Sequence, residues 1–354
     1  MYLYSFKEVA LLQIYGGGRI RGMKIKLTHK FEDIINLDNL LNAWGEFLNG
    51  KRGRRDVQLF GLNLMDNLLS LHHDLLYHKY NHGGYKAFKV FDPKIRDIHK
   101  ASVRDRLLHH AIYRKLYSFF DKIFIFDSYS CRLNKGAHKA VLRFNKFFLK
   151  ISKNNTKNCW VLKGDIRKFF ASIDHQILFS ILNKYIVDKN IVCLLQNIIH
   201  SFQVKEGKGL PLGNLTSQLF ANIYLNVFDQ FIKHKIKARF YIRYADDFVI
   251  MSDNKECLEN QIGLIKEFLF LNLKLEIHPQ KIFIKTVSSG LDFLGWINFP
   301  EHKVLRKSTK RRMICKLKES NKESSLNSYL GLIKHGNAYK LKLEILKLIN
   351  NKNW

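Results

Sequence analysis

An apolar segment containing two adjacent aspartates constrains this chain more than any other feature. Apolar and aromatic residues alternate before Asp246 and Asp247, and an apolar run from Phe248 to Met251 follows them. This pattern predicts two short strands joined by a tight turn, with the acidic pair near its tip. Adjacent carboxylates in an apolar hairpin repel each other and lose hydration, which is costly unless a cation compensates. Mg²⁺ is the natural candidate because it binds carboxylate oxygens together with substrate phosphates; an exposed Asp-Asp turn is the alternative.

A second acidic strand end supplies the third carboxylate that a two-metal site needs. An apolar strand beginning at Cys159 ends at Asp165, where the chain opens into a turn, so the backbone carbonyl of Ile166 could also face a metal. A strand-end aspartate is common by itself. In combination with the acidic hairpin, it predicts two Mg²⁺ ions bridged by Asp165 and Asp246 and supported by Asp247, with Mn²⁺ as a possible substitute.

The charge of the chain indicates a polyanionic partner. Lys and Arg total 60 against 30 Asp and Glu, which gives a net charge of +30 and makes nucleic acid the first choice. A membrane surface is the weaker alternative, because no apolar run approaches the roughly 20 residues of a spanning helix. The five cysteines are widely spaced without a C-x-x-C motif. That spacing argues against a zinc ribbon or a disulfide framework and predicts a cytoplasmic protein.

The N-terminal part of the chain is predicted to be helical and then to form a basic hairpin. Apolar spacing indicates amphipathic helices over residues 30–80, and Gly83-Gly84 breaks them before a strand at Tyr85–Val90. Lys94 and Arg96 lie near the ends of short strands and could clamp a triphosphate. The alternative is a plain basic hairpin. Further basic residues suited to a nucleic-acid backbone are Arg104, Arg132, Lys135, Arg143, Lys310, Arg311 and Arg312.

The remaining elements follow from the same periodicities. A helix is expected from about Leu215 with Gln218 on one face, and another over residues 258–271. A strand and turn are predicted at Leu273–Lys281, a tight hairpin at Gly290–Trp296, and basic helices from about Thr309 onward.

The order of these motifs resembles that of reverse transcriptases. Over residues 85–300 the shared features are the basic fingers, Asp165 with Phe169-Phe170, the Gly-Leu-Pro-Leu-Gly turn at 209–213, Tyr244-Ala-Asp-Asp247, the Lys281 strand and the Leu-Gly-Trp hairpin. The resemblance implies an α+β right-hand polymerase fold with fingers, an antiparallel palm sheet and a helical thumb. We expect an N-terminal tail and helical extension at 1–84, fingers and palm at 85–300, and a basic thumb at 301–354.

The same resemblance implies an activity and several roles. The expected activity is RNA-directed DNA polymerisation with a template RNA, a DNA primer and dNTPs. Lys94 and Arg96 would clamp the phosphates. Lys281 would donate a proton to pyrophosphate, with an ordinary surface lysine as the alternative. Phe170 would exclude a 2′-hydroxyl by its volume, with a core phenylalanine as the alternative.

Residues 212–218 point to one group of reverse transcriptases. Intron-encoded enzymes usually begin this segment with Gln-Gly and end it with Ser-Pro, whereas this chain has Leu212 at the Gln position and Gln218 at the Pro position. Those residues, together with segments 104–111 and 127–132, resemble the enzymes of diversity-generating retroelements. That resemblance implies mutagenic retrohoming: inaccurate copying of a dedicated RNA, with errors at template adenines and a small basic accessory protein. The alternatives are a group II intron-like, retron or abortive-infection enzyme, and a non-catalytic basic RNA-binding protein.

Overall fold

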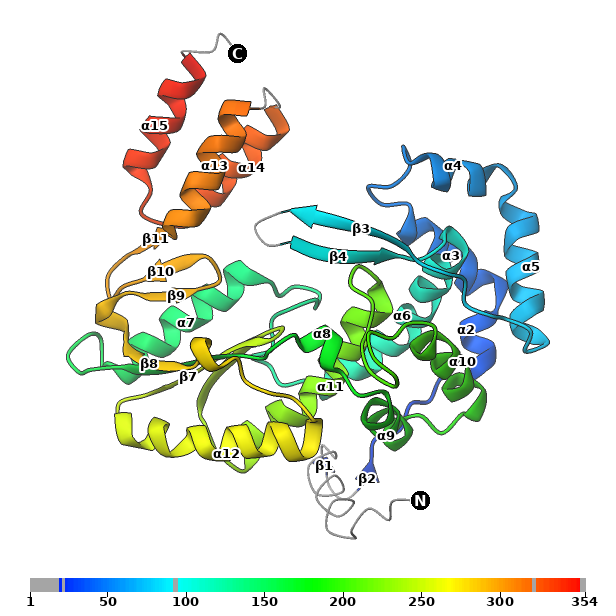
Figure 1. Cartoon of the computed structure of the whole chain (residues 1–354), viewed down its shortest axis with the longest axis horizontal. Coiled ribbons are helices and arrows are strands. Elements are labelled where there is room, and N and C mark those ends of the chain that lie inside the picture. The colour runs from blue at the N-terminus through cyan, green and yellow to red at the C-terminus, as the bar shows by residue number, and fades with distance from the viewer. Residues whose placement is uncertain (1–18, 21–22, 92–94, 320–322, 351–354) are drawn as a thin grey trace.

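A four-stranded antiparallel sheet forms the centre of the molecule (Figure 1). The computed structural model describes residues 19–20, 23–91, 95–319 and 323–350. The sheet has the strand order β6-β7-β5-β8, and its strands are β5 (Trp160–Asp165), β6 (Phe240–Tyr244), β7 (Asp247–Ser252) and β8 (Phe283–Thr286). The predicted α+β class with an antiparallel palm sheet is therefore confirmed.

The sheet is buried on both faces because consecutive residues of its strands are apolar, and consecutive side chains of a strand point to opposite faces. Leu162, Phe248 and Ile250 belong to the larger core, together with helices α11 (Leu215–His234) and α12 (Lys255–Leu273). Their neighbours along the strands pack into a second core that includes apolar residues of α7 (Ala137–Ile151). In Figure 1, α12 and α7 accordingly lie on opposite sides of the sheet.

Gly164 shows how tightly the central strands approach one another. It pairs with Phe248 across β5 and β7, and a Cβ atom at Gly164 would lie 2.3 Å from Cζ of that ring. Only glycine leaves this space for the phenylalanine ring, one residue before Asp165.

Helices precede and follow the β3–β4 hairpin, which is formed by β3 (Lys86–Phe91) and β4 (Ile95–Lys100) and whose residues are exposed or half-buried. Ser102 caps the long helix α6 (Val103–Ile123), and Asp174 caps α9 (His175–Tyr185). The helices before the hairpin are α2 (Phe31–Ile35), α3 (Leu37–Phe47), α4 (Arg55–Leu62) and α5 (Leu64–Leu76). Those after it include α6, α8 (Phe169–Ser172), α9 and α10 (Lys189–His200). A short pair, β1 (Arg19–Ile20) and β2 (Met23–Lys24), precedes them.

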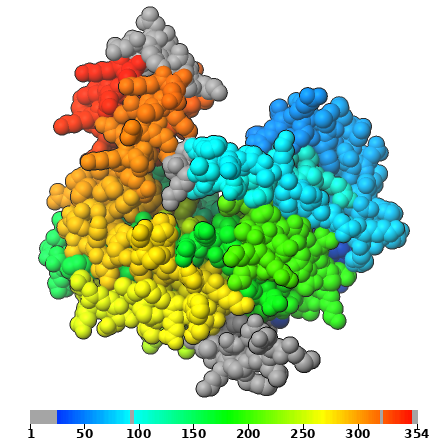
Figure 2. Space-filling model, in the orientation of Figure 1, coloured from blue at the N-terminus to red at the C-terminus, as the bar shows by residue number. Residues whose placement is uncertain are grey.

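The C-terminal region forms a small three-stranded sheet followed by three helices. The strands are β9 (Leu291–Phe293), β10 (Trp296–Asn298) and β11 (Lys303–Leu305), and the helices are α13 (Lys307–Glu319), α14 (Glu323–Ile333) and α15 (Tyr339–Asn350). The helices share their own core around Met313, Leu317 and Ile345. Figure 2 shows an opening between these helices, in orange and red, and the N-terminal helices, in blue.

Of the strand and turn predicted at Leu273–Lys281, the strand is wrong, whereas the turn is present. Helix α12 runs to Leu273, Lys274 ends it with a left-handed backbone (φ 48°), and a 3₁₀ turn occupies Pro279–Lys281. The apolar alternation instead reflects burial of Leu275 and Ile277 in the larger core, where only Ile277 forms an isolated bridge, to Ile166. Among the described residues, no helix combines the length and apolarity needed to cross a membrane.

A buried ion pair holds the strand that leads into the acidic turn. Arg243 on β6 is 1% exposed, and its Nε and Nη2 atoms each donate to Asp229 of α11 at 2.7 Å. Arg243 Nη1 also donates to the carbonyl of Ala245, and Nη2 donates to the Ser128 hydroxyl. The hydroxyl of Tyr241 donates to the same aspartate at 2.7 Å. One guanidinium thus connects α11, β6, the turn and a loop.

Replacing Asp229 with alanine should destabilise the protein strongly, because it leaves the Arg243 charge buried without its carboxylate. Breaking such a pair costs about 3–5 kcal/mol in the free energy of unfolding, which denaturant unfolding measures. Glu259→Ala is the control, since it breaks the exposed Lys255–Glu259 pair on α12 and should cost less than about 1 kcal/mol. Equal effects of the two substitutions would contradict the structural importance given to Arg243.

Candidate active site

Backbone pairing brings the three predicted aspartates together. Asp165 ends β5 and pairs with Asp247 at the start of β7, and Asp246 lies in the turn between β6 and β7. Ala245 forms this turn in a left-handed backbone conformation (φ 52°). The N–H of Ile166 donates to the carbonyl of Asp246 at 3.2 Å, which ties the end of β5 to the turn. The grouping predicted from sequence is therefore present.

The carboxylates of the turn are held in an environment that disfavours their charge. Burial raises the pKa of Asp246, and the charge of Asp165 raises it further, although Lys281 and Arg96 act in the opposite direction. Burial likewise raises the pKa of Asp247 to about 6, against the lowering effect of Lys163. Burial is thus the main reason that these two carboxyl groups resist ionisation, and repulsion from the neighbouring aspartates adds to it.

Two lysines contact the carboxylates. Nζ of Lys281 lies 2.6 Å from Oδ1 of Asp165, and Nζ of Lys163 lies 3.8 Å from Oδ1 of Asp247. Within the parts of the chain that the structure describes, no group of three His, Cys, Asp or Glu side chains converges closely enough to hold a metal. Asp165 and Asp247 thus each lie beside an ammonium group.

The chemistry of the donor set nevertheless fits a divalent cation. Three carboxylates gather at one sheet edge, and the positive charge near them leaves two with raised pKa values. Hard cations such as Mg²⁺ favour carboxylate and carbonyl oxygens. Ile166, the predicted backbone ligand, is buried next to Asp165, with its N–H directed at the Asp246 carbonyl.

The β3–β4 hairpin is bound directly to the loop that contains Leu212. The N–H of His99 donates to the Leu212 carbonyl at 3.0 Å, and the Asn214 side-chain amide donates to the His99 carbonyl at 3.0 Å. Arg96 lies exposed on the same β4 strand, and its charge contributes to the pKa of Asp246. Lys94 lies outside the described residues.

The other predicted substrate-binding residues are half-buried. Phe170 begins the short helix α8 with Phe169, packs against the larger core, and accepts the Leu210 N–H through its carbonyl at 2.8 Å. Gln218 lies in the first turns of α11, after the loop containing Leu212. Their roles toward substrate stay predictions.

Most of the predicted nucleic-acid-binding residues have partners within the protein. Arg132 is 5% exposed and paired with Asp121, which gives it a clear structural contact. The remaining pairs and positions are Arg104 with Asp74, Arg143 with Asp127, Lys135 with the Phe126 carbonyl, Lys310 with Glu344, exposed Arg311 and half-buried Arg312. Their contacts to nucleic acid stay predictions.

Sequence reasoning missed Lys163 and Arg243. Lys163 lies two residues before Asp165, so strand alternation alone places both on one face of β5. Arg243 lies inside an apolar strand, where a buried charge needs a partner. That partner, Asp229, is identifiable only from the tertiary structure.

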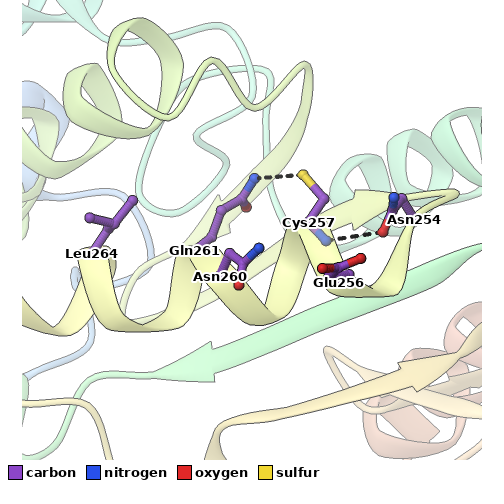
Figure 3. A pocket seen from close by; sticks show the side chains of 6 residues that line it. All are labelled: Asn254, Glu256, Cys257, Asn260, Gln261 and Leu264. Carbon is purple, nitrogen blue, oxygen red and sulfur yellow. Dashed lines mark hydrogen bonds between the residues drawn. The ribbon is translucent and has the colours of Figure 1, made fainter.

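A surface hollow of about 460 Å³ lies elsewhere, along α12 (Figure 3). Its walls carry Asn254, Cys257, Gln261 and Leu264, and Gln261 donates to the Cys257 sulfur at 3.4 Å. None of the three aspartates lines it.

Comparison with known proteins decides the family. A model of the family "Reverse transcriptase (RNA-dependent DNA polymerase)" matches residues 89–298, which is more than half of the chain and includes all three aspartates. This chain belongs to the reverse transcriptase family. The family predicted from the order of the motifs is confirmed.

Several curated proteins are similar to this chain at low sequence identity. Protein YkfC of Escherichia coli K12 is 27% identical over 292 residues, covering 70% of this chain and 71% of that protein. The group II intron-encoded protein LtrA of Lactococcus lactis is 23% identical, covering 57% of this chain and 44% of LtrA. The retron Ec83 reverse transcriptase of Escherichia coli is 26% identical, covering 58% and 70%. The chain thus spans less than half of LtrA.

Removing the charge of Asp247 should stabilise this reverse transcriptase in metal-free buffer at pH 8. The folded pKa of about 6 exceeds the ordinary value of 3.8, so native stability falls as the pH rises from about 4 to 6 and stays lowered above that window. Asp247→Asn avoids this cost and should gain about 1–2 kcal/mol at pH 8, a value reduced for partial exposure. The gain should vanish near pH 4.

Thermal unfolding in EDTA at pH 4 and pH 8 measures this difference. Asp253→Asn is the control, because Asp253 is an exposed aspartate just beyond the end of β7. A loss of stability in Asp247→Asn at pH 8 would contradict the raised pKa assigned to Asp247.

Proposed function

We propose that this chain is an RNA-directed DNA polymerase whose catalytic carboxylates are Asp165, Asp246 and Asp247. The observation that supports the proposal is their pairing at one edge of the sheet, where burial and mutual repulsion raise the pKa of Asp246 and Asp247. Side chains that repel one another in this way are expensive to keep for structure alone. This arrangement favours a polymerase over a non-catalytic RNA-binding protein of the same fold.

The residues of the site have distinct tasks in this proposal. Asp165, Asp246 and Asp247, with the Ile166 carbonyl, would hold two Mg²⁺ ions, or Mn²⁺ in their place. The bound ions would activate the primer 3′-oxygen and neutralise pyrophosphate. Lys281 is 37% exposed, so its ammonium can leave Asp165 and donate a proton to the leaving group. Arg96, with Lys94, would orient the triphosphate, and Phe170 would limit the space beneath the sugar.

The proposed substrates and layout follow the family. The template is RNA, the primer is DNA and dNTPs are the monomers. We propose an N-terminal extension at 1–84, fingers and palm at 85–300, and a thumb at 301–354, with nucleic acid lying in the opening of Figure 2. The predicted basic residues Arg104, Arg132, Lys135, Arg143, Lys310, Arg311 and Arg312 would add positive potential around it.

Asp246→Asn should abolish nucleotide incorporation while leaving RNA binding nearly unchanged. The substitution removes a charged oxygen ligand, whereas affinity for RNA depends mainly on Lys and Arg contacts to phosphates. Primer extension on an RNA template with and without Mg²⁺, together with a filter-binding assay, measures both properties. Asp253→Asn should behave like the unmodified protein in both assays. Extension at a near-native rate by Asp246→Asn would refute the assignment.

Within the family, we propose the error-prone enzyme of a diversity-generating retroelement. The support is the sequence of residues 212–218 and the position of Leu212, half-buried on a loop bound to β4. This assignment brings a dedicated template RNA, a small basic accessory protein and a cytoplasmic location as further expectations. The similarity to LtrA and to the retron Ec83 enzyme makes an intron-like or retron-like polymerase the second candidate.

Leu212→Gln should lower misincorporation opposite template adenines more than it lowers overall extension. Leucine offers only packing beside the nucleotide, whereas glutamine can add a hydrogen bond worth about 0.5–1.5 kcal/mol, or about two- to tenfold in selection. Sequencing of cDNA copied from one adenine-containing template measures the error spectrum. Leu264→Gln is the control, because Leu264 is exposed on α12. An unchanged spectrum with retained activity would exclude Leu212 as a determinant of accuracy.

A further inference from the structure

A buried lysine connects the catalytic turn to a different part of the molecule. Lys163 lies on the central strand β5, and its side chain is 12% exposed. Its Nζ atom donates to the backbone carbonyl of Asp292 in β9 at 2.9 Å and lies 3.8 Å from Oδ1 of Asp247. A buried ammonium is costly without such partners, so both contacts determine where it lies.

The contact with β9 leads to the base of the C-terminal helices. The carboxylate of Asp292 accepts from Nη2 of Arg306 at 2.5 Å. The backbone N–H of Arg306 donates to the carbonyl of Gly295, in the turn between β9 and β10, at 3.0 Å. Helix α13 begins at the next residue, Lys307. Asp247 is therefore linked to the start of α13 through Lys163, Asp292 and Arg306, over a short series of polar contacts.

Lys163 differs from the other lysine of the site in its freedom to move. Lys281 lies on a 3₁₀ turn and its side chain is 37% exposed, so it can swing away from Asp165. Lys163 lies on a strand paired on one side with β7 and on the other with β8, opposite Val249 and Phe283. This pairing, the low exposure of the side chain and its two polar contacts leave the ammonium little freedom to move.

We propose that Lys163 is a positioning residue that holds the Asp247 carboxylate and the β9–β10 hairpin in one fixed relation. The catalytic turn and the base of the proposed thumb then keep their spacing while the primer end is extended. The proposal rests on the proposed polymerase function and adds a residue outside the three carboxylates. Lys163 acts through Asp247 and the Asp292 backbone, without touching substrate itself.

Single-turnover incorporation and primer–template dissociation test this role. Lys163→Met should slow incorporation of one dNTP by about 10–100-fold, because small misplacements at a reacting centre cost rates of this size. It should also speed primer–template dissociation by about three- to tenfold. Lys163→Arg, which keeps a positive charge and donors, should recover part of both losses. Lys266→Met, on the exposed side of α12, should change neither.

Asp292→Asn separates the two ends of the link. It retains the backbone carbonyl that Lys163 contacts but weakens the pair with Arg306. Dissociation should therefore rise while incorporation stays within about twofold of the unmodified protein. The proposal would be overturned if Lys163→Met kept both the incorporation rate and the dissociation rate within about twofold of the unmodified protein. It would also be overturned if Lys163→Met and Lys163→Arg changed these rates equally.

A thermal-unfolding cycle tests the link without any activity. Lys163→Met should lower the midpoint of thermal unfolding by at least about 2–4 °C when Asp247 is present. The same substitution should lower it by less in the Asp247→Asn background. Equal lowering in both backgrounds would show that Lys163 does not act through Asp247 and would overturn the proposal. A protein that extends no primer but shows the coupling would instead refute the polymerase assignment alone.

Discussion

The buried pair of Arg243 and Asp229 is the constraint on which the geometry of the acidic turn depends. Both side chains are almost completely removed from solvent, so their charges are maintained only by close mutual hydrogen bonding. Burial of Tyr241 raises the pKa of its hydroxyl, and the charge of Asp229 raises it further, so Tyr241 stays a neutral donor. Because Arg243 also binds the Ala245 carbonyl, the left-handed turn has one supported orientation. These buried contacts directly precede Asp246 and restrict where its backbone can lie.

Charge balance explains the lysines of the site as well as its carboxylates. Three carboxylates without a cation would repel one another, and the structure compensates two of them with ammonium groups at unequal distances, 2.6 Å and 3.8 Å. The closer and more exposed ammonium, on Lys281, can exchange with another cation, whereas Lys163 stays on its strand. Both lysines lie beside aspartates, but their exposures suit them to different tasks: Lys281 to a changing partner and Lys163 to a constant one.

The sequence was sufficient for elements whose signals are local. The acidic hairpin and the Asp165 strand both depend on neighbouring residues, and the structure has them as predicted. The strand predicted within Leu273–Lys281 is wrong because alternating apolar residues indicate only that side chains are buried. A segment can be buried in a core without pairing in a sheet. Arg243 and Lys163 were missed for the converse reason, since their partners, Asp229 and the Asp292 carbonyl, lie elsewhere in the chain.

Two separate connections join segments that lie far apart in the sequence. On the N-terminal side, the His99 N–H of β4 donates to the Leu212 carbonyl and the His99 carbonyl accepts from the Asn214 amide, so two hydrogen bonds join the β3–β4 hairpin to the Leu212 loop. Gly213 is needed there, because a Cβ atom would lie 2.9 Å from Ile98. From the C-terminal side, Lys163 joins Asp247 to β9. The β3–β4 hairpin is therefore bound to the Leu212 loop, and β9 to the central strand β5, through backbone carbonyls whose positions depend on the fold more than on any single side chain.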